Sequence, residues 1–304
     1  MRTLRGAILI SILAAVVTIG MKAAAYVATG SVGLFSDALE SVVNLVAAAT
    51  AYLSLMYAAR PADPSHTYGH AKIEYFASGF EGVLVLVAGA GTAYFAVLRF
   101  ITPQVLEHIG LGTGIAVGAG AINFITARLL LNLGRQHQSP VVEAEGEHLM
   151  TDVWTTLGVV AGLVLVHFTG YTWLDPLLAL AVGLNILRIG FRLVQTAFDG
   201  LMDRALPAAE QERMRKAIRA ALPEGTDFHA LRTRRAGQST FGQFHLLVPG
   251  AMTVQSAHDL ANTLEATIQA AMPEATITIH VEPIDDATSF ETSELVQLGE
   301  RPGP

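Results

Sequence analysis

Residues Leu34–Ala58 read LFSDALESVVNLVAAATAYLSLMYA, an apolar stretch long enough to cross a membrane as a helix. The stretch carries three strongly polar side chains in its first half, at Asp37, Glu40 and Asn44. In a helix these three share one face, because residues three or four apart point in nearly the same direction. A charged group at the bilayer centre costs about 2.5–3.5 kcal/mol on insertion scales. Such a stripe therefore predicts a function inside the membrane.

Five further apolar stretches and the overall composition indicate a membrane protein. Of the 304 residues, 52% are hydrophobic and only 15% are charged, whereas soluble domains carry about a quarter charged residues. Each stretch reaches the ~20 residues that cross the hydrocarbon core, so we expect a six-helix transmembrane domain over residues 1–205. The six stretches are Ala7–Ala28, Leu34–Ala58, Ile73–Ile101, Ile109–Leu133, Val142–Phe168 and Trp173–Phe198.

Lysine and arginine gather on one side of the predicted helices, which the positive-inside rule assigns to the cytoplasm. Six crossings then place both termini in the cytoplasm. The net charge of −7 and the pI of 5.8 argue against nucleic acid as a partner. The chain has no cysteine, which excludes disulfides and thiolate metal ligands. The basic residues of that side are Arg2, Arg5, Arg60, Lys72, Arg128, Arg135 and Arg204.

The composition changes near Leu206, and a small soluble domain is predicted over residues 206–286. Its segments follow the order helix, strand, strand, helix, strand, which favours a two-layer α+β fold. Residues 287–304 are polar and end in Pro-Gly-Pro, so we expect a disordered tail. The predicted elements are a helix from Pro207 to near Leu222, strands Phe228–Arg235 and Thr240–Val248, a helix Thr253–Met272 and a strand Ala275–Val281.

Three groups of polar residues offer the oxygen and nitrogen donors of a divalent transition metal. The first combines the stripe of the second span with His148 and Asp152, which lie four apart on the fifth span. The second lies in the loop after the second span, with the spacing Asp63-x2-His66-x3-His70. The third lies in the soluble domain, whose strands and second helix carry His229, His245, His258 and His280, with Glu282 on the same strand face as His280.

Other interpretations stay open at this point. The membrane residues could form a hydrogen-bonded structural cluster, and the remaining histidines could be ordinary surface residues. An intramembrane metalloenzyme is disfavoured because no H-E-x-x-H motif is present. A membrane-anchored metal sensor without transport and a carrier for an organic cation are further alternatives. Among metals, the lack of cysteine disfavours Cu(I), and the histidines count against Ca²⁺ and Mg²⁺.

Taken together and in this order, the motifs resemble the cation diffusion facilitators, most closely their bacterial zinc/iron efflux branch, over residues 5–286. SVGLFSDALES at Ser31–Ser41 is similar to the family signature, and His148-x3-Asp152 is similar to the ligand pair of its fifth helix. The loop motif PADPSHTYGHAK at Pro61–Lys72 matches the metal site of that loop in the branch. The four histidines of the soluble domain match its cytoplasmic binuclear site.

The resemblance implies a homodimer in the bacterial inner (plasma) membrane, with a six-helix bundle and a metallochaperone-like cytoplasmic domain in each subunit. It implies a proton-coupled antiporter, not an enzyme, that exports a divalent metal by alternating access. Zn²⁺ is the first candidate, followed by Fe²⁺, Co²⁺, Mn²⁺, Cd²⁺ and Ni²⁺, with the metal as both substrate and structural ligand and protons as counter-ion. The implied transport ligands are Glu40, Asn44, His148 and Asp152, and Lys72 and Asp203 fall where the branch places a charge interlock.

Three positions depart from the family pattern. Glu40 stands where aspartate or histidine is usual, Asn44 where aspartate is usual, and Glu282 where aspartate is usual. With Asn44 neutral, Glu40 and Asp152 are the charged members of the transport set. The departures leave the choice of metal and the proton stoichiometry open.

Overall fold

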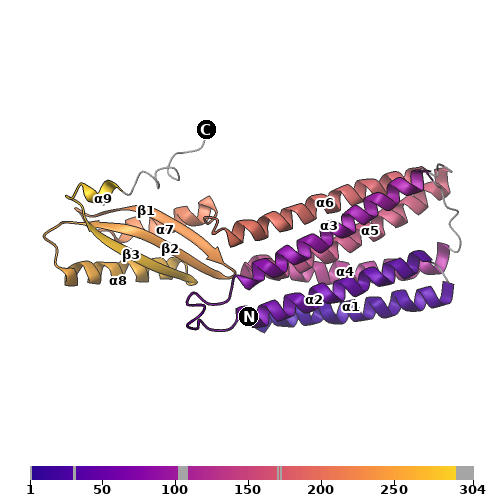
Figure 1. The fold of residues 1–304 in the computed structure, drawn as a ribbon, viewed down its shortest axis with the longest axis horizontal. Coiled ribbons are helices and arrows are strands. Elements are labelled where there is room, and N and C mark those ends of the chain that lie inside the picture. The colour runs from indigo at the N-terminus through magenta and orange to yellow at the C-terminus, as the bar shows by residue number, and fades with distance from the viewer. Residues whose placement is uncertain (1, 30–31, 102–108, 170, 172, 292–304) are drawn as a thin grey trace. The chain divides into compact units, whose positions relative to one another are not determined.

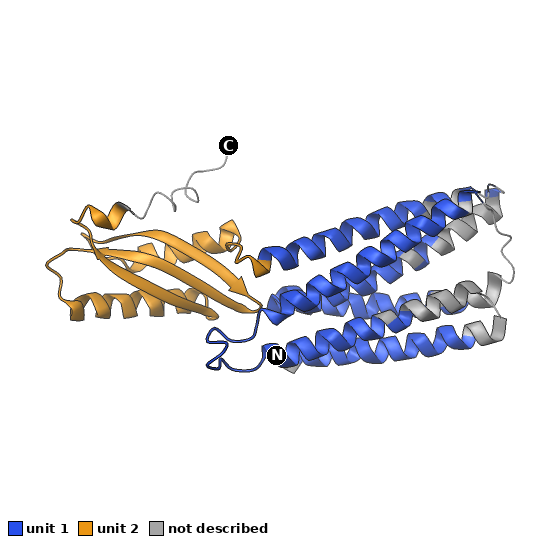
Figure 2. Cartoon of the chain, viewed as in Figure 1, with its two compact units in different colours: residues 1–199 blue, residues 200–304 orange. Residues whose placement is uncertain are grey.

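The computed structural model describes residues 2–29, 32–101, 109–169, 171 and 173–291. In several helical stretches it describes the backbone alone, among them residues 25–29, 32–40, 109–113 and 159–168. The chain divides into two compact units, Met1–Asp199 and Gly200–Pro304 (Figure 2).

Long helices form the first unit, one at each of the predicted apolar stretches (Figure 1). Helix α4 runs to His137 and helix α5 starts at Pro140, so both are longer than predicted. Gln138 has a φ of 53° and turns the chain between them, and proline suits a first helical turn because its missing N–H is not needed there. The helices are α1 (Arg2–Thr29), α2 (Val32–Ala58), α3 (Ile73–Ile101), α4 (Ile109–His137), α5 (Pro140–Thr169) and α6 (Leu174–Leu201).

The helical unit is apolar both inside and outside. An apolar core joins α1 to α5 and includes Leu4, Leu55, Leu130 and Leu149. Outward-facing side chains are apolar too, and Leu13, Phe95 and Ile125 are 63% to 69% exposed. Such a surface suits lipid rather than water, because a helix in a soluble bundle is polar on its outer face. Within the described residues, three segments are long and apolar enough to cross a membrane, namely Thr3–Ala24, Ile73–Leu98 and Val117–His137.

The second unit has the predicted order of helix, strand, strand, helix, strand. Strands β1 and β2 pair antiparallel, whereas β2 and β3 pair parallel with the second helix as the crossover between them. Helices α7 and α8 pack on one face of the sheet around Phe244 and Leu246. The elements are α7 (Ala208–Ala221), β1 (Asp227–Ala236), β2 (Ser239–Val248), α8 (Val254–Ala271) and β3 (Ala275–Pro283). The predicted fold class, a membrane helical bundle followed by an α+β domain, is confirmed.

A short helical segment follows β3 at the start of the predicted tail, and disorder over the rest of residues 287–304 stays a prediction. A short helix, α9, covers Thr288–Glu291. Ser289 is buried and its hydroxyl donates to the carbonyl oxygen of Pro283 over 2.8 Å. The Phe290 ring lies 5.7 Å from the ring of His229. These contacts hold the segment against strands β1 and β3, and residues 292–304 lie outside the described part of the chain.

Candidate metal centres

Three side chains of the predicted transport site meet inside the helical unit. Asn44 on α2 and His148 and Asp152 on α5 are only 2% to 4% exposed. The Asn44 amide nitrogen donates to Asp152 Oδ2, and His148 Nε2 lies 2.9 Å from Asn44 Oδ1. One amide therefore joins the imidazole to the carboxylate, and two separate helices supply the donors. These hydrogen bonds bring an imidazole, an amide and a carboxylate together in the interior of the helical unit.

A residue that the sequence did not single out completes this cluster. Asn123 on α4 is 2% exposed and donates from its amide nitrogen to Asp152 Oδ2 over 3.3 Å. Its own Oδ1 is buried without a hydrogen-bond partner among the described residues. The signal in the sequence was an isolated amide in an apolar span. Its direction could not be predicted, because the register of α4 against α5 is set by packing.

The remaining predicted transport ligand, Glu40, lies on α2 one turn before Asn44. Its side chain, like that of Asp37, lies outside the described residues. The fourth ligand of the predicted set is therefore a prediction, supported by its position on the face that carries Asn44.

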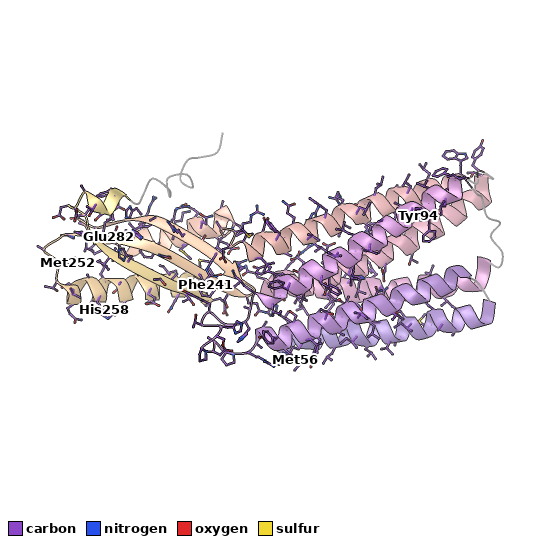
Figure 3. The ribbon with its side chains drawn as sticks, in the orientation of Figure 1. Met56, Tyr94, Phe241, Met252, His258 and Glu282 are labelled. Atoms are coloured by element: carbon purple, nitrogen blue, oxygen red, sulfur yellow. The ribbon has the colours of Figure 1, made fainter. Side chains whose placement is uncertain are left out.

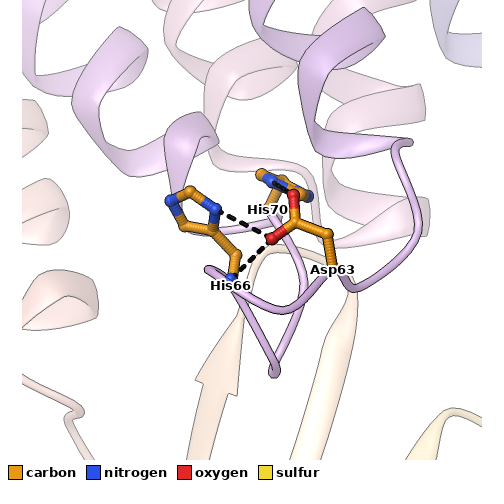
Figure 4. Close-up of side chains that lie close together, drawn as sticks. All are labelled: Asp63, His66 and His70. Atoms are coloured by element: carbon orange, nitrogen blue, oxygen red, sulfur yellow. Dashed lines mark hydrogen bonds and ion pairs between the residues drawn. The ribbon is translucent and has the colours of Figure 1, made fainter.

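The predicted loop site forms as a compact group between α2 and α3 (Figure 4). Asp63 Oδ1 lies 3.3 Å from His66 Nδ1, and Asp63 Oδ2 lies 3.2 Å from His70 Nε2. His70 is buried and packs its ring against Tyr57, with the ring centres 4.8 Å apart. Its Nδ1 has no hydrogen-bond partner among the described residues. The group thus offers a carboxylate and two imidazoles on one side of the loop.

Asp63 is fixed by the backbone of its own turn. The N–H groups of Ser65 and His66 donate to Oδ1 over 2.8 Å and 2.7 Å, as in an Asx turn. The donation from the His66 N–H is the main reason why the pKa of Asp63 is lowered. Both N–H groups of the turn donate to Oδ1, and Oδ2 is the oxygen that lies near His70. An ionised carboxylate held in this way fits a divalent cation.

The cytoplasmic group is built by strand register. His229 pairs with His245 across β1 and β2, and His245 pairs with His280 across β2 and β3. Directly paired residues point to the same face of a sheet. That face is opposite the one covered by α7 and α8, since Phe244 and Leu246, the neighbours of His245 on β2, belong to the core. The three imidazoles therefore form a row across the face opposite α7 and α8.

Glu282 gathers these imidazoles from the same face of β3. Its Oε2 lies 2.9 Å from His229 Nε2, and its Oε1 lies 3.1 Å from His245 Nδ1. The pairing of β1 with β2 shifts between His229 and Arg232, where Ala230 has a φ of 57°. Bulges of this kind re-aim a side chain beside a site, and here the bulge follows His229 directly.

The charge and spacing of this group fit a zinc-like ion. Two ligands of tetrahedral zinc, each about 2.1 Å from the ion, lie about 3.4 Å apart. The donor atoms of His229, His245 and Glu282 all lie within 4.8 Å of one another. Burial pushes the pKa of Glu282 upward, but its hydrogen bond to His229 and the charge of His245 outweigh burial and lower the pKa overall. The carboxylate is thus ionised and ready to bind.

The other two predicted cytoplasmic ligands hold looser positions. His280 Nε2 lies 3.4 Å from Glu282 Oε1, and its side chain is 62% exposed. His258 lies on α8, in the layer behind the sheet, and contacts Asn262 through Nε2 over 3.1 Å. Figure 3 shows His258 and Glu282 on different sides of this unit. Within one chain, the fold does not bring His258 to the other histidines.

The predicted charge interlock joins residues of the two different units. Asp203 has a φ of 57° and accepts a hydrogen bond from Arg234 over 3.3 Å, inside the second unit. Lys72 lies in the first unit, directly before α3. Their pairing stays a prediction.

Comparison with known families agrees with a membrane domain followed by a cytoplasmic domain. The family model described as "Cation efflux transmembrane domain" matches residues 8–202. The model described as "Cation efflux protein, cytoplasmic domain" matches residues 206–284. The fold and the buried donor cluster thus define a cation-efflux membrane protein. The chain belongs to the cation diffusion facilitator family, as the resemblance of its motifs implied.

Relatives match over nearly the whole chain. An uncharacterized transporter of Synechocystis sp. is 44% identical over 93% of this chain and 91% of its own length. The cation-efflux pump FieF of Serratia proteamaculans is 30% identical over 93% of both chains.

A solved structure matches a smaller part of the chain. The metal-bound C-terminal domain of the CzcD transporter from Thermotoga maritima is 28% identical and covers 27% of this chain and 99% of that one, with a TM-score of 0.24.

Proposed function

We propose that this protein exports a divalent transition metal from the cytoplasm in exchange for protons. Zn²⁺ is the proposed substrate, with Fe²⁺, Co²⁺, Mn²⁺, Cd²⁺ and Ni²⁺ as the alternatives to test. The protein would act as a homodimer in the bacterial inner membrane, with both termini in the cytoplasm. Its relative FieF of Serratia proteamaculans is named a cation-efflux pump, which supports the direction of transport.

The observation that carries the proposal is the buried cluster of Asn44, His148 and Asp152. Its donors come from α2 and α5 and are cut off from solvent. A buried carboxylate inside lipid is costly unless its charge is compensated. A divalent ion bound to Asp152, and to Glu40 on the same side of α2, would have its charge neutralised by two carboxylates. The ion could then cross the bilayer without its water shell.

Exchange follows because metal and protons compete for the same atoms. Imidazole and carboxylate ligands must be deprotonated to hold a metal. When the helices rock to open the site to the other side, as in alternating access, protons can take His148 and the carboxylates and displace the ion. The proton gradient would then drive the metal outward. His148 is the proposed switch, because imidazole is the side chain best suited to change charge near neutral pH.

The loop and cytoplasmic groups have a different proposed role. Both lie outside the apolar bundle, where no bilayer has to be crossed, so they would bind structural or regulatory metal. An ion that binds the folded arrangement stabilises it by mass action. In a dimer, such ions would favour one docking of the cytoplasmic domains. A metal sensor without transport would use these two groups, but it would not explain the buried cluster of the bundle.

Flux in proteoliposomes tests the proposal. The six candidate metals would be offered one at a time under an imposed pH gradient, to the wild type and to Asn44→Asp. We expect gradient-driven movement of Zn²⁺ in the wild type. The added charge of Asn44→Asp should change affinity or metal preference by about tenfold, equivalent to about 1.4 kcal/mol. Absence of gradient-driven flux for every metal would refute transport, and an unchanged Asn44→Asp would remove Asn44 from the ligand set.

A further inference from the structure

A second pair of acidic side chains lies buried in the helical unit, apart from the proposed ligands. Glu81 on α3 is 0% exposed and Glu145 on α5 is 1% exposed. Lone buried carboxylates are rare in apolar helices because their ionised form is expensive there. Neither residue belongs to the three metal groups, so their burial needs another explanation.

The packing of α3 on α5 places the two carboxyl groups near each other. Ala77, one turn before Glu81, shares an apolar cluster with Val141 and Val142 of α5. Val85, one turn after Glu81, shares another with Ala144, the neighbour of Glu145. Glu81 therefore lies between two contacts with the same part of α5. Glu145 belongs to that same part of α5, and both side chains are buried there.

The surroundings of the pair offer little to compensate two negative charges. The Ser11 hydroxyl on α1 donates to Glu145 Oε1 over 2.5 Å. Among the described residues, Glu145 Oε2 and both oxygens of Glu81 are buried without a hydrogen-bond partner.

Apolar side chains of the neighbouring helices lie against the glycine that follows each acid. On α6, Val194 and Leu193 lie against Gly82, and on α2 Leu55 packs in the same cluster as Ala77. From α4, Leu131 lies against Gly146, the residue after Glu145. The charged groups near this end of α4 and α5 pair with one another instead, because Arg135 lies 3.1 Å from Glu143 and 3.6 Å from Glu147.

Like charges in a low-dielectric site cannot both persist at close range. Two carboxylates that share such a site keep at least one proton between them. Protonation also removes the charge from a carboxyl group whose oxygens lack a hydrogen-bond partner among the described residues. The geometry therefore favours one protonated and one ionised carboxyl group, which makes the pair a site for a proton.

The position of Glu145 connects this proton to the metal. Glu145 precedes His148 by three residues on α5, a rise of about 4.5 Å along the helix axis. A divalent ion at His148 would favour the ionised form of a carboxyl group about one turn away, because opposite charges attract strongly in a poorly screened interior. The arrival of metal would thus drive the shared proton off toward bulk water.

We infer that Glu81 and Glu145 form a proton-binding acid pair, which holds one proton at neutral pH and releases it when a divalent metal occupies the transport site. This inference rests on the proposed exchange and adds to it a proton carrier outside the ligand set. Asn44 stands where the family usually has an acid, so the transport site has one ionisable group fewer. The acid pair would supply the missing proton-binding group from outside the ligand set.

Infrared difference spectroscopy on the full chain in liposomes tests the acid pair. We expect the wild type to show a protonated carboxyl absorption at neutral pH that decreases when Zn²⁺ is added. Glu81→Gln and Glu145→Gln should each lose this Zn²⁺-induced change, and a pH-sensitive dye should report about one proton fewer released per bound ion. Glutamine keeps the shape of glutamate, and in Glu145→Gln the amide oxygen of the new side chain would still accept the hydrogen bond of the Ser11 hydroxyl.

Glu74→Gln is the matched control. Glu74 is equally buried, lies two turns before Glu81 on α3, and accepts a hydrogen bond from Ser139. We expect it to keep the Zn²⁺-induced change of the wild type. An unaltered spectrum and proton release in both Glu81→Gln and Glu145→Gln would overturn the acid pair. The flux assay is a separate readout for the proposed exchange of metal for protons. If Zn²⁺ binds but no gradient drives its flux, the proposed exchange is wrong. A pH titration of the carboxyl absorption still decides whether the acid pair holds a proton.

Discussion

The buried cluster of the membrane bundle and the cluster on the cytoplasmic sheet use similar ligands in opposite surroundings. In the bundle, Asn44, His148 and Asp152 are at most 4% exposed, and an amide joins the imidazole to the carboxylate. On the sheet, the side chains of His229 and Glu282 are 15% and 13% exposed, and the carboxylate contacts the imidazoles directly. The same chemistry is therefore fully buried in one place and partly exposed in the other.

This difference in burial bears on the roles proposed for the two clusters. A sealed site can release its ion only if the helices around it move, and such a site can be open to one side of the membrane at a time. A partly exposed site on a sheet can reach solvent without a movement of helices. The contrast fits the proposed division, in which the bundle moves the metal and the sheet binds structural or regulatory metal. Substitutions that affect one cluster should spare the other.

Removal of the imidazole from the bundle should have the largest effect. His148→Ala takes away one ligand and the proposed proton acceptor, and it leaves Asn44 Oδ1 without its contact. We expect gradient-driven metal flux in proteoliposomes to fall by about 100-fold or more, since loss of even an outer partner of a ligand costs about 10–100-fold. Metal binding at the sheet should stay at the wild-type level when measured by calorimetry. Wild-type flux in a correctly assembled His148→Ala protein would break the comparison.

Removal of an imidazole from the sheet should give the reverse pattern. His245 is the central member of the row and contacts Glu282. We expect His245→Ala to weaken metal binding at the sheet by about 10–100-fold and to lower flux by only a few-fold. His258→Ala is the informative companion, because His258 lies in the layer behind the sheet. If equilibrium dialysis finds the same loss in both variants, His258 is a ligand through the partner chain of a dimer.

Much of the sheet cluster could be predicted from sequence because a strand has a period of two residues. His280 and Glu282 had to share a face, and the histidines on neighbouring strands needed only the correct register to meet. The helices and the order of the elements could also be predicted, because the length of an apolar stretch and the period of its pattern are properties of a single segment. Local pattern was sufficient wherever one element decides the direction of its own side chains.

Features that depend on contacts between elements could not be predicted in this way. The bulge after His229 depends on how β1 fits β2, and α9 is ordered by its contacts with Pro283 and His229. The match of His258 to a ligand position came from family resemblance, and one chain alone does not place it beside the others. Asn123 was missed because only the packing of α4 on α5 turns its amide toward Asp152.

A substitution of Asn123 should have the smallest effect, and it tests whether this residue helps to orient Asp152 in the bundle cluster. Its amide nitrogen donates over 3.3 Å to Asp152 Oδ2, the oxygen that also accepts the hydrogen bond of the Asn44 amide. Asn123→Leu keeps the volume and removes the donor, so it should cost on the order of 1 kcal/mol, or about fivefold in apparent metal affinity. Asn185→Leu on α6 is the control, since Asn185 binds Arg188 rather than the cluster. Flux measured against metal concentration separates the outcomes: a shifted affinity at unchanged maximal rate means that Asn123 orients Asp152 for binding. If neither quantity changes, the hydrogen bond from Asn123 does not orient Asp152, and the cluster is no larger than the sequence predicted.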